Sequence, residues 1–139
     1  MEPWPLSYGW QKKPLRRSQY APLRATIITA SPLKIVEAIK ESLQEADIFP
    51  FSINGDQQDS YFYGGVVILP PKRVEMVVNL TFMSSGEDAF DSLHHYSTTI
   101  RDVVKATDTN GRIQWTELPY MTSDNWSIGG LWNRVWKLF

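Results

Sequence analysis

The residues that could bind a metal ion lie around position 94. His94 and His95 are adjacent, and Asp91 precedes them by three and four positions, so Asp91 could share a helix face with either histidine. Imidazole and carboxylate groups bind zinc, but a site needs a further protein ligand, and adjacent residues on a helix point in different directions. A solvated or interface role is the better interpretation, and we expect no metal and no cofactor.

Covalent catalysis would have to use serine, because the chain has no cysteine. A serine nucleophile needs a base and an orienting group, and no recognised spacing supplies them. Ser84 and Ser85 stand three residues before Glu87 and Asp88, which is the spacing of a helix capping box. Gly64-Gly65 precedes a strand instead of opening a helix, so we expect a bend or bulge there and no phosphate loop. The sequence therefore predicts a protein that is not an enzyme.

The elements that would position these residues are two strands and a helix. Residues 66–69 form a continuous apolar run, and residues 74–82 keep one face apolar by alternation. The link through Pro70-Pro71 is too short for a parallel crossover, so it predicts antiparallel pairing. A helix should start at Ser84 or Ser85. Its apolar stripe follows at helical spacing: Phe90, Leu93, Ser97, Ile100 and Val104.

The rest of the chain adds a second helix and several extended segments. Ser31-Pro32 is a helix start signal, and the apolar stripe after it predicts a helix that ends near Asp47. Residues 25–30 indicate a short strand or a lead-in to that helix, and residues 54–60 a polar turn. Three more segments are predicted as extended: residues 49–51, 112–118 and 131–139.

These elements define one α+β domain within a chain of 139 residues. We expect a mostly antiparallel sheet with two helices packed on one face, because each helix has one apolar stripe and the best strand has one apolar face. The domain should cover residues 25–139, preceded by an extended arm, residues 1–24. No apolar run is long enough to cross a membrane, and the start of the chain lacks a secretory signal, so we expect a cytosolic protein with no membrane partner.

The arm differs from the domain in charge and composition. It is rich in proline and holds five Lys or Arg residues against Glu2 alone, whereas the whole chain has a net charge of −1. Such a segment either lies on a neighbouring subunit or contacts nucleic acid through phosphate and base stacking, and the first interpretation is favoured. The residues that we expect to contact a partner are aromatic or basic: Trp4, Tyr8, Trp10, Lys12, Lys13, Arg16, Arg17 and Tyr20.

The order helix, two strands, helix, strand, strand resembles the tail terminator or tail-completion proteins of long-tailed bacteriophages. The resemblance covers roughly residues 32–139, and depends on Phe49-Pro50-Phe51 before the two strands and on the closing segment after Gly130. It implies a non-enzymatic virion component, assembled in the host cytoplasm, that forms a homo-oligomeric ring, with a hexamer as one candidate size, and contacts neighbouring tail and neck proteins.

Three alternatives stay open at this point. The long basic arm departs from the compact pattern of that family, so a neck or connector protein is equally compatible. A small α+β nucleic-acid-binding module would use the arm, and would bind polynucleotide in a salt-dependent way. A ligand-binding domain or enzyme would need a pocket, which a sequence alone does not reveal.

Overall fold

The sheet is built around its longest strand, β1 (Gln19–Ile28), which lies between β6 and β7 in the computed structural model. The structure describes residues 2–5, 9–53 and 56–122. Within them, eight strands pair antiparallel in the order β2-β3-β4-β6-β1-β7, with β5 on β6 and β8 on β1. The other strands are β2 (Asp47–Ile53), β3 (Asp56–Tyr63), β4 (Val66–Ile68), β5 (Lys72–Val74), β6 (Val77–Ser85), β7 (Arg112–Glu117) and β8 (Met121–Thr122).

The position of β1 corrects the predicted boundary at residue 24. β1 crosses it, so the last residues assigned to the arm belong to the central strand. Pro22 obscured this strand in the sequence, because proline has no N–H to donate. The structure accommodates it at a gap: the Pro22 carbonyl accepts a bond from the Leu118 N–H (3.0 Å), so its nitrogen also faces the interval between β7 and β8.

Both predicted helices exist, with shifted ends. α1 (Pro32–Ser42) has proline in its first turn as expected, and ends before Asp47. α2 (Ala89–Thr107) begins after the predicted start, because β6 continues through Ser85. Ser84 is therefore no helix cap: it is buried in the strand, and its hydroxyl donates to the Gly65 carbonyl at 2.8 Å.

Tight turns explain the strand order on the other side of β6. Gly64 and Gly65 have φ values of 56° and 82° and join β3 to β4, so the expected bend is a two-residue hairpin turn. The polar stretch predicted as a turn is β3 from Asp56 onward, and it pairs with β2. The antiparallel pairing after Pro70-Pro71 is confirmed, although β6 itself starts at Val77, after a turn in which Glu75 has a φ of 53°.

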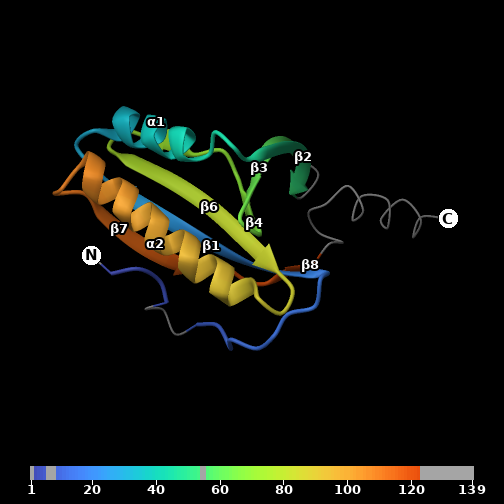
Figure 1. Cartoon of the computed structure of the whole chain (residues 1–139). Coiled ribbons are helices and arrows are strands. Elements are labelled where there is room, and N and C mark those ends of the chain that lie inside the picture. Colours follow the sequence, from blue (N-terminus) through green and yellow to red (C-terminus); the bar gives the residue numbers. More distant parts are fainter. Residues whose placement is uncertain (1, 6–8, 54–55, 123–139) are drawn as a thin grey trace.

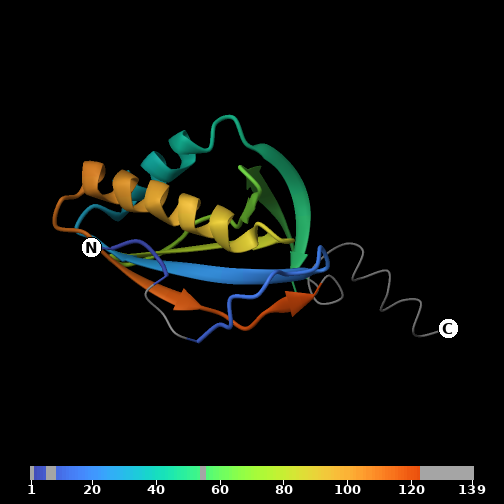
Figure 2. The ribbon, with the colours of Figure 1, turned by 60° about the horizontal axis from the view of Figure 1, so that its bottom comes forward.

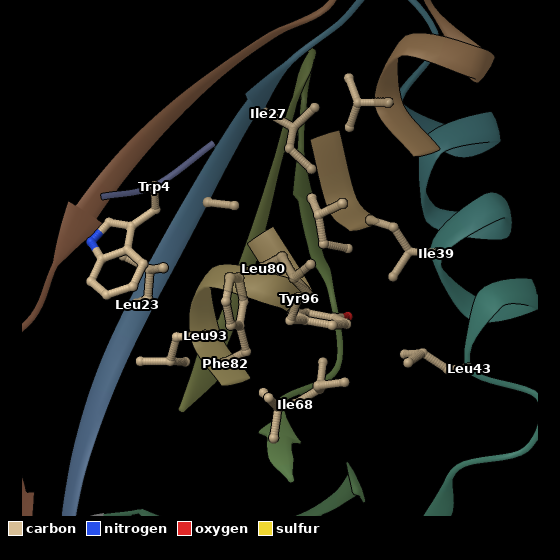
Figure 3. Close-up of a cluster of buried hydrophobic side chains, with 14 of the residues drawn as sticks. Trp4, Leu23, Ile27, Ile39, Leu43, Ile68, Leu80, Phe82, Leu93 and Tyr96 are labelled. Atoms are coloured by element: carbon tan, nitrogen blue, oxygen red, sulfur yellow. The ribbon is translucent and has the colours of Figure 1, made fainter. Parts of the chain in front are cut away.

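The predicted fold class is confirmed: two helices cover one face of a mostly antiparallel sheet (Figure 1). Between the layers lies the main core, in which Leu80 and Phe82 of β6, Ile39 of α1 and Leu93 of α2 are fully buried (Figure 3). Figure 2 shows β2 steeply inclined to β1 at one end of the sheet. Neither described helix is long and apolar enough to cross a membrane. The predicted strand 131–139 lies outside the described residues.

Candidate functional site

The arm packs on its own domain, along the edge where α2 overlies β7 (Figure 1). Trp4 is 1% exposed and belongs to the main core (Figure 3). Its ring stacks on Phe90 of α2 with centroids 6.1 Å apart, and meets Trp10 edge-on at 5.8 Å. Aromatic pairs at these separations add to the free energy gained from burial. The arm is thus attached to the domain by two tryptophan side chains.

Polar contacts fix the arm in place. Glu117 at the end of β7 accepts the Trp4 indole N–H through Oε2 at 3.0 Å. Its Oε1 accepts the backbone N–H groups of Gly9 (3.1 Å) and Trp10 (3.2 Å). A carboxylate that accepts three N–H donors holds its partners more strongly than a neutral acceptor does. We call the surface that receives the arm the arm socket: Phe90, His94, Ser97, Glu117 and Leu118.

Only one residue of the histidine pair, His94, belongs to this socket. His94 Nδ1 lies 2.7 Å from the Trp4 carbonyl oxygen, so that nitrogen carries the proton and donates it. His95 is exposed on a neighbouring face of α2. Among the described residues, no group of three His, Asp or Glu side chains could hold a metal ion. His94 therefore positions the arm on its own domain, within one chain.

The eight residues predicted to contact a partner do not form one surface. Trp4 and Trp10 face their own domain, Tyr20 is half-buried in β1, and Tyr8 lies outside the described residues. This placement differs from the expectation that the two tryptophans bind a neighbouring subunit. The basic residues remain accessible: Lys12, whose Nζ lies 4.8 Å from the Trp4 ring centroid, together with Lys13, Arg16 and Arg17.

The face of the sheet away from the helices, which we call the open face, has an apolar cluster of its own. Phe51, Val67 and Met83, from β2, β4 and β6, are at most 7% exposed there. Alternation along each strand places them opposite the main core. Phe62 lies across from Val67 and is 43% exposed. Further apolar side chains pack around this cluster: Tyr20, Phe49, Leu69 and Met121.

A groove of about 680 Å³ crosses the open face. Its walls come from β1, β3, β6 and the segment that leads into β8. They mix apolar with hydrogen-bonding side chains, and the charged ones are Arg24, Lys72 and Asp56. Both cations are exposed. Such a mixture suits a peptide segment with apolar and polar side chains, and no nucleophile with a base and an orienting group lines it.

Two buried hydroxyl groups have no hydrogen-bond partner among the described residues, Tyr96 in the main core and Ser60 in β3. Burial of Tyr96 raises the pKa of its hydroxyl, because water cannot solvate the phenolate, and Tyr63 adds to this effect. Asp108 shows the reverse: hydrogen bonds from the Thr29 hydroxyl (2.6 Å) and nearby N–H groups lower the pKa of its carboxyl. Tyr96 and Asp108 both lie away from the groove, so we infer that they contribute to the stability of the fold.

The open face was not predicted as a site. The sequence predicted residues 49–51 only as an extended segment and residues 66–69 only as a continuous apolar strand. The available signal was that Val67 and Met83 are apolar on the face that polar residues should occupy, which predicts a second buried surface. No protein-family model and no curated protein matches this sequence. The fold and its surfaces define the class: an α+β protein with one covered and one open sheet face.

Proposed function

We propose that this protein acts by assembly with copies of itself, as a structural component and not as an enzyme. The observation that carries the proposal is the open face, where a buried apolar cluster continues into exposed aromatic surface. Phe62 is 43% exposed and lies opposite Val67, which is only 7% exposed. An apolar patch bordered by polar groups is typical of a protein interface. A partner on this face would complete the burial that the helices provide on the other.

The assembly that we propose is a ring in a bacteriophage virion, as a tail terminator or a neck connector. It accords with the resemblance described above, and with a fold in which both helices of the described residues lie on one face of the sheet. Neighbouring tail and neck proteins would be further partners, and assembly would take place in the host cytoplasm. No cofactor is needed for such a role.

The arm has a different part in this proposal from the one that its sequence suggested. Trp4 and Trp10 are occupied within the chain, so they stabilise the subunit that assembles. Lys13, Arg16 and Arg17 stay exposed and can meet an acidic partner, although exposed ion pairs contribute only about 0 to 1 kcal/mol each. The alternative of a nucleic-acid-binding arm loses Trp4 and Trp10 as stacking residues for the same reason.

The experiment is to measure the mass of the native chain by size-exclusion chromatography with light scattering, and to image it by negative stain. We expect an oligomeric ring. Phe62→Ser on the open face should reduce the oligomer, because it removes exposed apolar surface from the interface. Leu33→Ser is the matched control, since Leu33 is 61% exposed on α1, in the helix layer. A native chain that stays monomeric at all concentrations would contradict the proposal, and so would equal losses in the two variants.

A further inference from the structure

The groove on the open face has the size and chemistry of a site for a few side chains. Its volume of about 680 Å³ falls within the range of about 300 to 1,000 Å³ that encloses compact ligands. Leu69 and Met83 supply apolar wall, while Gln58, Asn79 and Thr81 supply amide and hydroxyl groups. An occupant should therefore be a peptide segment with large apolar side chains and few charges.

The chain itself contains such a segment. Residues 123–139, which lie outside the described residues, include Trp126, Trp132 and Trp136 and only three charged side chains. A tail that stays in water has few apolar residues, whereas this segment is rich in them. It also begins where the groove ends, because Met121 lines the groove and packs on the apolar cluster of the open face. The segment therefore follows closely after a residue of the groove, Met121.

The direction of β8 decides between the groove of the same chain and that of another. β8 runs antiparallel to β1, with Met121 opposite Tyr20 and Thr122 opposite Gln19. The chain thus leaves the sheet past the first residue of β1, at the end where β8 lies in Figure 2. The groove lies in the opposite direction, beside Pro22 and Arg24. Docking on its own groove would require the segment to reverse at once, whereas a neighbour's groove can lie ahead of it.

We propose that residues 123–139 of one copy bind in the groove on the open face of the next copy. The inference rests on the proposed function and names the contact through which assembly takes place. The segment and the groove are different surfaces, so the contact is heterologous. A heterologous contact generates a ring where the rotation between neighbouring copies closes. An extended chain spans up to about 3.3 Å per residue, so the segment is long enough to cross a neighbour's sheet.

The test uses the absence of cysteine in the native chain. One full-length variant is Thr81→Cys, in the wall of the groove, and the other is Asn133→Cys, in the donor segment, which keeps all three of that segment's tryptophans. The two are mixed and treated with a bifunctional maleimide. We expect a cross-linked dimer of twice 16.0 kDa, at a yield about tenfold above the control because bound thiols react at a high effective concentration. In the control, Glu37→Cys on exposed α1 replaces Thr81→Cys.

The double variant Thr81→Cys/Asn133→Cys separates the two directions of docking. Dimers and larger products support exchange between copies, whereas a cross-link within a single chain overturns it. A yield no higher than that of the Glu37→Cys control also overturns the proposal.

A second measurement separates this inference from the proposed function. Trp132→Ser/Trp136→Ser in the full chain should reduce the oligomer to monomer, whereas Asn133→Ser, a polar change in the same segment, should leave it intact. If the native chain is an oligomer and the double substitution leaves its mass unchanged, the segment is not the contact, although assembly stands. If the native chain is monomeric, both proposals fail.

Discussion

Replacing Trp4 by alanine should destabilise the protein as much as a substitution in the centre of its core. Trp4 is 1% exposed, packs on Phe90 and Trp10, and donates its indole N–H to Glu117 at 3.0 Å. The substitution removes the ring and leaves one oxygen of Glu117 without that donor. The arm then has only its other contacts to hold it on the socket.

The magnitude follows from the buried area. A tryptophan buries about 150 to 250 Å², which at about 25 cal/mol per Å² corresponds to about 4 to 6 kcal/mol as an upper bound. The variant can recover part of this, because a detached arm regains about 1 to 2 kcal/mol of backbone entropy per residue. We therefore expect a loss of about 3 kcal/mol in the free energy of unfolding. Trp4→Phe keeps most of the ring and should cost about 1.5 kcal/mol, for the lost hydrogen bond to a charged carboxylate.

Urea unfolding followed by far-ultraviolet circular dichroism measures these differences without depending on tryptophan fluorescence. Lys13→Ala is the control, because Lys13 is an exposed arm residue and should change stability by less than about 0.5 kcal/mol. Trp10→Ala should cost clearly less in the Trp4→Ala background than in the native chain, since the two rings are in contact. A Trp4→Ala variant as stable as Lys13→Ala would refute the packing of the arm on its own domain.

Four further outcomes are expected from substitutions outside the arm. Leu93→Ala should cost about 2 to 5 kcal/mol because Leu93 is fully buried, whereas exposed Leu33→Ala should be near neutral by the same urea assay. Gly64→Ala should cost about 1 kcal/mol, since its φ is 56° and no atom lies within 4 Å of an added Cβ; Gly64→Asn should cost less, because asparagine tolerates this conformation. Stability should fall as the pH rises above about 10, where the unfolded state releases the Tyr96 proton and the folded state keeps it, and Tyr96→Phe should make that fall less steep in urea titrations at increasing pH. Hydrogen bonds lower the pKa of Asp108, so its contribution is present above its usual pKa of 3.8 and lost as the pH falls below it; Asp108→Asn should weaken the loss of stability with acid, and an unchanged acid profile would contradict this.

The parts of the fold that local chemistry specifies were predictable. The apolar stripe with Leu93 and Ile100 gave α2, and Ser31-Pro32 gave the start of α1, because helix periodicity and capping act over a few residues. The start of α2 was wrong because Ser84 fits both a cap and a strand. Ser84 pairs with Ala21 of β1, and this pairing makes it part of the strand.

The candidate site depended on contacts that no local pattern contains. Glu117 lies 113 positions after Trp4, so nothing around either residue shows that they meet. The arm sequence predicted that Trp4 and Trp10 contact a partner, whereas the structure packs both on their own domain. The two tryptophans reach the main core only because the fold places α2 beside β7.

The sequence by itself determined the two helices, several of the strands and the apolar face of each of these, because backbone propensity and side-chain period are local properties. The tertiary structure decided that β1 lies in the centre of the sheet, that Trp4 fills the edge of the core, and that Val67 and Met83 meet on an open face. Strand pairing joins residues far apart in the chain, and the free energy of burial depends on the whole arrangement. The surface proposed for assembly is a product of that arrangement and of no single segment.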